Sequence, residues 1–380
     1  MAPKLHKQGP KVDRMIAPFP RRFVFLGLSI TSLWDNTHAP VYRTLLRALV
    51  ARGHHVLFLE RLTAPYLPGA QELPSACGEV QFYGSINDLR VRFSRDVRTA
   101  HCVIVGSSLE DGDQIAQWVM DTARGARAFY DFDTAATLAE LERTRGRNSD
   151  GAAVPVSEYD LYLSLTGGSQ LARMAAHLDT TTARPLHCSF DPAWHTPMDA
   201  TKQWELGYVA SDAPDERPMV EQYLLDVARR MPRRRFVVAG SMCDDSRQWP
   251  ANVRRIAPVA NTHQRGFYAQ QRYALNLTPD APRAGAAHSR LFQAAACGTP
   301  IITDHWPGLD QFFEPGAEVL IAATPDDVVQ HLCEVPEPVR KALSARARRR
   351  LMRAHTPSHR ARALERYVEE VARTEQYHAC

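Results

Sequence analysis

The chain has 380 residues, of which 44% are hydrophobic and 23% are charged, and this composition excludes a disordered chain. Such a length exceeds one ordinary hydrophobic core and indicates two domains. The 46 basic and 42 acidic residues leave a formal net charge of +4. That excess is too small to indicate binding to nucleic acid, so we expect no nucleic-acid partner.

The first 20 residues are basic and rich in proline, and we expect them to form a flexible tail. The apolar run behind them is short and lacks a small-residue cleavage site, so we expect no secretory signal. No segment of the sequence is long and apolar enough to span a bilayer. The seven cysteines include no Cys-x-x-Cys pair, which argues against a disulfide framework or a zinc site and favours the cytoplasm. Cys102 and Cys297 lie in apolar runs and are expected to be buried.

Short apolar runs alternate with longer stretches along the first half of the chain. Such runs are typical of strands that are buried on both faces of a parallel sheet, joined by crossover helices. The expected strands are Phe23–Ile30, His55–Glu60, Cys102–Gly106, Ala128–Phe132 and Tyr162–Leu165.

The clearest helix is predicted over Ala39–Gly53. Its apolar residues recur at helical spacing and are Tyr42, Leu45, Leu46, Leu49 and Val50. Arg43, Arg47 and Arg52 are expected to point the other way, and Gly53 is well placed to end the helix. With the strands on either side, this helix forms one βαβ unit.

A second series of apolar runs follows a segment without periodicity, Pro185–Trp204, where we place the domain boundary. The expected strands are Leu206–Ala210, Phe236–Gly240, Ala274–Leu277, Pro300–Thr303 and Glu318–Ile321. From about Pro336 the pattern is helical, with a break near Thr356–Pro357. The predicted fold is two doubly wound, Rossmann-like α/β domains that face each other across a cleft, over residues 21–190 and 205–350, followed by a helical segment over residues 351–380.

The strongest local signal is the stretch GAAHSRLFQAAACGTP, residues 285–300, which predicts a short helix ending at Gly298. Ser289 is a candidate cap, and the helix N-terminus offers N–H groups and a positive dipole end to a phosphate. Arg290 adds a charged fork for phosphate oxygens, and Gln293 lies on the same helix face, within reach of a ribose hydroxyl. An ordinary surface helix with a serine cap and a solvated arginine explains the stretch equally well.

The loop after the first strand, SITSLWDNTHAP, carries a second candidate site. His38 is a candidate general base, because histidine titrates near neutral pH, and Asp35 lies three residues before it. The simpler interpretation is that Asn36 or Thr37 caps the helix and His38 is a residue of its first turn.

Polar residues also follow other predicted strands. Asp131 and Asp133 end one strand, where Asp133 is expected to cap the next helix and Asp131 is left as a second candidate base. In the second half, Tyr208 and the pair Gly240–Ser241 end strands where a nucleotide is expected to lie, and Asp304–His305 follows another strand. The acidic residues near Glu110 lack the spacing of a calcium loop, and we expect no metal site.

The sequence resembles the glycosyltransferases related to the spore maturation protein CgeB, which have the GT-B fold, over roughly Arg22 to Tyr367. The matching stretches are FLGLSITSLWDNTHAPVYRTLLRALVARGHHVLFLER, AFYDFDT, YDLYLSLTGG, RFVVAGS and, most specifically, SRLFQAAACGTPIITDHWPGLDQFF. The resemblance implies an acceptor-side N-terminal domain and a C-terminal domain that binds a nucleotide diphosphate-sugar. It assigns the diphosphate to Ser289 and Arg290, beside His288, and the ribose to Gln293.

The chain departs from this pattern in two places. Related sequences usually carry glutamate at the position of Gln293 and often Gly-Asn-Gly-His where this chain has Asp35-Asn36-Thr37-His38. Many retaining GT-B enzymes have two glutamates at the positions that are here Gly285 and Gln293.

The sequence therefore predicts transfer of a sugar from a nucleotide diphosphate donor to an acceptor hydroxyl, without a metal or other cofactor. A protein that binds a sugar nucleotide or glycan without catalysis, and a GT-B sugar-nucleotide epimerase, remain as alternatives.

Overall fold

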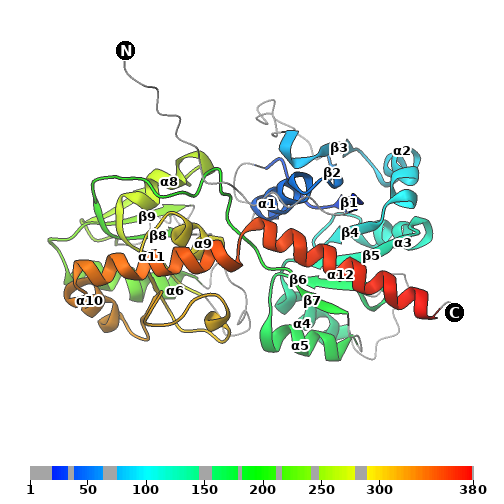
Figure 1. The fold of residues 1–380 in the computed structure, drawn as a ribbon. Coiled ribbons are helices and arrows are strands. Elements are labelled where there is room, and N and C mark those ends of the chain that lie inside the picture. Colours follow the sequence, from blue (N-terminus) through cyan, green and yellow to red (C-terminus); the bar gives the residue numbers. More distant parts are fainter. Residues whose placement is uncertain are drawn as a thin grey trace, which may run out of the picture.

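The computed structural model describes residues 19–32, 38–62, 75–144, 156–178, 182–210, 216–240, 248–278 and 289–378. They form two parallel sheets with helices packed on both, in two lobes joined by the long helices at the end of the chain (Figure 1). This arrangement confirms the predicted fold class.

The first sheet has seven parallel strands in the order β3-β2-β1-β4-β5-β6-β7. The strands are β1 (Arg22–Leu26), β2 (His55–Arg61), β3 (Glu79–Tyr83), β4 (Cys102–Gly106), β5 (Ala126–Asp131), β6 (Leu161–Ser164) and β7 (Ala183–Pro185). The helices between them are α1 (His38–Ala51), α2 (Ile86–Thr99), α3 (Gly112–Thr122), α4 (Thr134–Thr144) and α5 (Gly168–His177). All five strands predicted in this half are present, and β1 ends earlier than predicted, so that residues 27–30 belong to the following loop.

The second sheet has six parallel strands in the order β10-β9-β8-β11-β12-β13. They are β8 (Trp204–Ala210), β9 (Phe236–Gly240), β10 (Val253–Ile256), β11 (Gln271–Asn276), β12 (Ile301–Thr303) and β13 (Leu320–Ile321). The helical elements are α6 (Glu216–Val220), a π-helical stretch (Glu221–Asp226), α7 (Val227–Arg230), α8 (Asn261–Ala269), α9 (Ser289–Ala296), α10 (Pro325–Glu334), α11 (Glu337–Ala354) and α12 (Pro357–His378). Short 3₁₀ turns lie at Ser75–Cys77, Val156–Glu158 and Leu309–Gln311.

The last helix, α12, returns to the first domain and packs on α1, β5 and β6, whereas α11 packs on α9 (Figure 1). The break between α11 and α12 falls at the predicted Thr356–Pro357. Two arginines of α11 bind backbone carbonyls of neighbouring segments. Arg346 donates to the Ala317 carbonyl, and Arg348 donates to the Ala296 carbonyl at the end of α9. These two arginines therefore have acceptors inside the protein.

Two of the three arginines predicted to point away from the apolar face of α1 are buried. Arg43 and Arg52 are each only 8% exposed, although the sequence pattern places them away from the apolar face. α12 packs on α1 and brings an acceptor to Arg52, whereas the loop after β1 supplies the acceptors of Arg43. Arg43 donates to the Ile30 and Ser32 carbonyls, and Arg52 donates to both carboxylate oxygens of Glu365.

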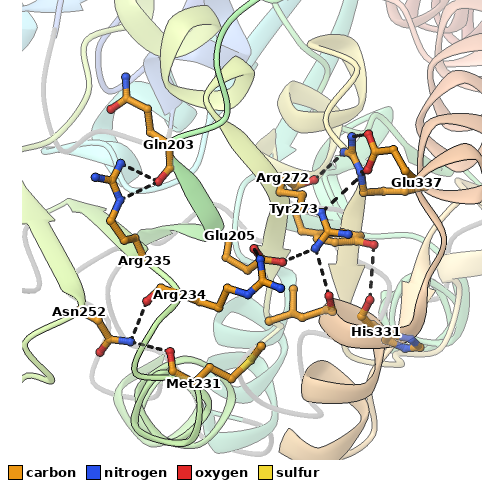
Figure 2. Close-up of polar contacts among 12 residues, drawn as sticks. Gln203, Glu205, Met231, Arg234, Arg235, Asn252, Arg272, Tyr273, His331 and Glu337 are labelled. Carbon is orange, nitrogen blue, oxygen red and sulfur yellow. Dashed lines mark hydrogen bonds and ion pairs between the residues drawn. The ribbon is translucent and has the colours of Figure 1, made fainter.

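A polar network ties the amino ends of the second sheet together (Figure 2). Glu205, at the start of β8, accepts from Arg234 and Arg272, and Arg272 also donates to the Leu332 carbonyl. The Asn252 amide donates to three backbone carbonyls at the end of α7 and before β9. Since ligands of doubly wound sheets bind at the carboxyl ends, this network at the opposite edge serves stability.

Among the described residues, no helix is long and apolar enough to cross a membrane. Cys102 and Cys297 are buried, as predicted.

Candidate functional site

The strand orders define where a ligand is expected in each domain. In a doubly wound sheet the ligand lies beyond the carboxyl ends of the strands, where the order reverses. The reversal falls between β1 and β4 in the first sheet and between β8 and β11 in the second. The predicted site residues of the first domain lie at the end of β5 and in the segment after β1. Those of the second domain lie near the ends of β8 and β9 and between β11 and β12.

A buried carboxylate that the sequence analysis missed organises the loop after β1. Glu60, in β2, accepts hydrogen bonds from the Ser29 hydroxyl at 2.8 Å and the Ile30 amide at 2.8 Å. It also accepts from the Thr31 amide and hydroxyl. Arg43 donates to the Ile30 and Ser32 carbonyls of the same loop. Glu60 and Arg43 together therefore bind both the N–H and the C=O groups at the start of this loop. The remainder of this loop, with the candidate base Asp35, lies outside the described residues.

His38 is the first residue of α1, and its ring stacks on Phe132 with 4.0 Å between centroids and 8° between planes. Burial lowers the pKa of His38 from 6.5 to about 4. The imidazole is therefore neutral at pH 7 and retains the capacity to accept a proton, although as a weak base.

Asp131 and Asp133 have different surroundings. Asp131 is fully buried, accepts hydrogen bonds from the Tyr162 hydroxyl and the Asp133 amide, and has its pKa raised by burial. Asp133 accepts from the Ala136 amide at 3.2 Å, which confirms that it caps α4. Asp131 thus lies beside Phe132, on which His38 stacks, but its carboxylate is engaged inside the domain.

In the second domain, Arg290 is tied to the end of β8. It lies in the first turn of α9 and donates to the Glu216 carboxylate at 2.6 Å, the Tyr208 hydroxyl at 3.2 Å and the Val209 carbonyl. Glu216 is 2% exposed and was not recognised from the sequence. A guanidinium has five N–H groups, so at most two remain for a further ligand. Arg290 and Tyr208 are therefore brought together as predicted, and a buried carboxylate joins them.

Ser289 is the first residue of α9 itself and not the residue before it, so it does not occupy the predicted capping position. His288 and Ser241 lie outside the described residues. Gly298 follows α9 with φ +73°, and the Thr299 amide donates to the Ala294 carbonyl. This is the helix C-terminus that the sequence predicts at Gly298.

Gln293 is 7% exposed, and its Oε1 accepts a hydrogen bond from the Tyr268 hydroxyl at 3.3 Å. In this conformation the Gln293 side chain is buried. Gly240 ends β9 with φ +133°, and a Cβ there would lie 2.2 Å from the Ala210 carbonyl oxygen. Only glycine permits this close approach of β8 and β9 at the candidate nucleotide site.

Asp304 follows β12 directly and is bonded to Thr278, two residues beyond β11, which the sequence did not single out. The Thr278 amide donates to its Oδ1 at 3.0 Å, and the Asn276 amide donates to the Thr303 hydroxyl at 3.1 Å. Burial raises the pKa of Asp304 from 3.8 to about 6. A half-buried carboxylate of this kind at the carboxyl end of a strand is a candidate ligand group.

Two doubly wound α/β domains, each with its order reversal at the carboxyl ends of the strands, define this protein as one of the GT-B fold. Residues 217–366, which include α9, α10 and α11, match a family model described as "Glycosyl transferase-like". A search of curated proteins found no match.

The chain is similar to several solved structures over most of its length. HepE from Anabaena, in complex with UDP and glucose, has a TM-score of 0.68 at 10% identity, covering 92% of this chain and 99% of that one. Sucrose-phosphate synthase from Thermosynechococcus elongatus has a TM-score of 0.66 at 12% identity, with 93% and 100% covered. AviGT4, a glycosyltransferase involved in avilamycin A biosynthesis, has a TM-score of 0.59 at 17% identity, with 93% and 98% covered. At these identities the likeness establishes the fold alone.

Proposed function

We propose that this chain is a glycosyltransferase that moves a sugar, of the hexosyl type, from a nucleotide diphosphate donor to an acceptor hydroxyl. The observation that carries the proposal is the position of α9, whose N-terminus and Arg290 meet the end of β8 at the order reversal of the second sheet. The glycosyl transferase-like match over residues 217–366 supports it. So do the complexes of structural neighbours, which hold UDP, or UDP-glucose in a second structure of HepE.

The diphosphate is the leaving group of the proposed reaction, and its developing negative charge needs positive partners. The backbone N–H groups of the first turn of α9 supply one, because they lack helical acceptors and carry the positive end of the helix dipole. The remaining N–H groups of Arg290 supply the other. Glu216 neutralises part of this charge, so its role is to hold the guanidinium at the end of β8 while the helix N-terminus carries more of the phosphate binding.

On this proposal the charge of the leaving group is met without a metal ion. Addition of EDTA to the assay is therefore expected to leave turnover unchanged. A loss of turnover that added Mg²⁺ or Mn²⁺ restores would contradict the metal-independent part of the proposal.

The acceptor hydroxyl needs a base, and we assign that role to His38, with Asp35 as its candidate partner. His38 is neutral at physiological pH and lies at the carboxyl edge of the first sheet, at the start of α1. Asp131 accepts hydrogen bonds from the Tyr162 hydroxyl and the Asp133 amide. We therefore assign it the role of fixing the end of β5, next to Phe132, whose ring stacks on His38.

The test is a turnover assay on the purified full chain with UDP-, GDP- and dTDP-hexoses and a panel of glycan, peptide and small-molecule acceptors. Release of the nucleoside diphosphate is measured together with the glycosylated product. The proposal expects release from one donor, stimulated by an acceptor. Absence of release from every donor by the folded protein, combined with absence of diphosphate binding, would refute it.

A second candidate function, binding of a sugar nucleotide without catalysis, is favoured by one observation. Gln293 occupies the expected ribose position, but its side chain is buried and bonded to Tyr268. If donors bind but neither transfer nor hydrolysis follows across the same panel, this second function replaces the first.

A further inference from the structure

Three polar side chains gather at the carboxyl ends of β11 and β12, beside the N-terminus of α9. Asn276 is the last residue of β11, Thr278 lies two residues beyond it, and Asp304 directly follows β12. In the parallel register Asn276 lies opposite Thr303. Since strand residues alternate between faces, Asn276 and Thr303 share the face of Ala274 and Ile301, which belong to the same apolar cluster as the residues of α9.

A chain of hydrogen bonds fixes these groups relative to one another. The Asn276 amide donates to the Thr303 hydroxyl at 3.1 Å, and the Thr303 hydroxyl donates to Oδ1 of Asp304 at 3.4 Å. The Thr278 amide donates to the same Oδ1 at 3.0 Å. The hydrogen bonds described for the Asp304 carboxylate thus converge on one oxygen, and the strand ends hold it in place.

The cluster has acceptor atoms that receive no hydrogen bond from the described residues. Oδ1 of Asn276 is buried and has no hydrogen bond among the described residues, although the side chain is only 4% exposed. In the described part of the chain no arginine or lysine forms an ion pair with Asp304, in contrast to Glu216 and Glu205 in the same domain. A buried amide oxygen without a donor and a half-buried carboxylate without a cation both cost free energy. Such a cost is typical of a site that is completed by a ligand.

The chemistry of the cluster selects the ligand class. Carboxylate and amide oxygens accept hydrogen bonds, so the missing partner is a donor, and a second anion such as phosphate is excluded by repulsion. Neutral hydroxyl groups meet this requirement without placing a further charge beside Arg290. A sugar attached to a diphosphate at the N-terminus of α9 brings such hydroxyls to this edge of the sheet.

We propose that Asp304, which the Thr278 amide and the Thr303 hydroxyl hold in place, forms a subsite that accepts hydrogen bonds from the hydroxyl groups of the donor's sugar. The inference rests on the proposed function, because it takes the diphosphate to lie at α9. It names residues that discriminate the sugar from the bare nucleotide, and Asp304 is the member that contacts the ligand directly, because it is the one that is not fully buried.

The test compares two ligands on the full-length protein by calorimetric titration. The first is whichever of UDP, GDP and dTDP binds, and the second is its hexose ester. Asp304→Asn keeps the size of the side chain and its ability to accept from the Thr278 amide but removes the charge. Asp310→Asn is the matched control, because Asp310 is exposed in the turn that follows.

We expect Asp304→Asn to weaken binding of the hexose ester by tenfold or more, since a hydrogen bond to a charged group is lost. The dissociation constant of the bare diphosphate is expected to change by less than about twofold. Asp310→Asn is expected to change the binding of neither ligand. Unchanged ester binding in Asp304→Asn, or an equal loss for both ligands, would overturn the subsite while leaving the glycosyltransferase proposal intact. If no diphosphate and no ester bind the folded wild-type protein, the proposed function fails first, and the subsite fails with it.

Discussion

The junction between α12 and the first domain provides a quantitative test of the structure. Glu365, in α12, accepts from Arg52 Nε at 2.5 Å and from the second Arg52 nitrogen at 2.6 Å, and it lies 2.7 Å from His54 Nε2. Burial alone would raise the pKa of Glu365, but His54 and Arg52 together lower it from 4.5 to about 2. A shift of this size corresponds to about 3 kcal/mol in favour of the ionised, folded form.

Glu365→Gln is therefore expected to lower the free energy of unfolding by about 3 kcal/mol, because it leaves Arg52 buried without its counter-charge. The measurement is urea unfolding at pH 7, followed by tryptophan fluorescence and circular dichroism. Because the folded pKa lies below the unfolded value, this stabilisation is complete above pH 4.5 and disappears as the pH falls towards 2. The variant should accordingly lose less stability than the wild type over that interval.

The matched control is Glu370→Gln, five residues further along the same helix. Glu370 is 41% exposed and pairs with Arg184 at 3.2 Å, so its replacement is expected to cost less than about 1 kcal/mol. Equal losses for the two variants, or an unchanged acid profile in Glu365→Gln, would refute the claim that α12 is held to the first domain by this buried pair.

Three further predictions concern the candidate site. His38→Ala should lower turnover by about 10²-fold or more while the donor dissociation constant stays the same. Because the pKa of His38 is about 4, wild-type turnover should lose no His38-dependent activity between pH 8 and 5. Normal turnover in the variant would contradict the role of His38 as a base. Gly240→Ala should cost about 2 kcal/mol or more in urea unfolding, because its Cβ would lie 2.2 Å from the Ala210 oxygen, and a midpoint equal to that of the wild type would contradict this. Asp304 has a folded pKa of about 6 against 3.8 unfolded, so the folded state holds the extra proton between these values and loses stability as the pH rises through them. Asp304→Asn should thus be more stable than the wild type by up to about 3 kcal/mol at pH 7.5 and equal to it near pH 4, and a constant difference across pH would contradict the assignment.

The strands that the sequence predicted are those whose two faces are both buried, such as β4 and β9. The strands it missed lie at or near the sheet edges, where one face is exposed. In β3, Glu79 is exposed and Gln81 half-buried, and in β10 two exposed arginines interrupt the apolar pattern. Apolar runs therefore locate the interior of a parallel sheet, whereas of the edge strands only β13 was predicted.

The site was less accessible to sequence reasoning because its contacts are long-range. The cap at Asp133 is local and was predicted, whereas Glu216 meets Arg290 across 74 positions and Glu365 meets Arg52 across 313. Nothing in the residues around Arg52 indicates that a helix from the other end of the chain covers them. The roles assigned to Ser289, Gln293 and the other predicted site residues stay predictions, as does the cytoplasmic location.

The measurement that tests the central claim most directly is calorimetric titration of the full chain with UDP, GDP and dTDP, comparing the wild type with Arg290→Gln/Glu216→Gln. The double variant removes the guanidinium without leaving Glu216 buried and unpaired, and Glu216→Gln alone keeps Arg290 as a control. The account predicts that the wild type binds one nucleoside diphosphate, that the double variant binds it at least tenfold more weakly, and that Glu216→Gln retains binding. Equal binding by the wild type and the double variant would contradict the role of Arg290, and no binding by the folded wild type would contradict a diphosphate site at α9.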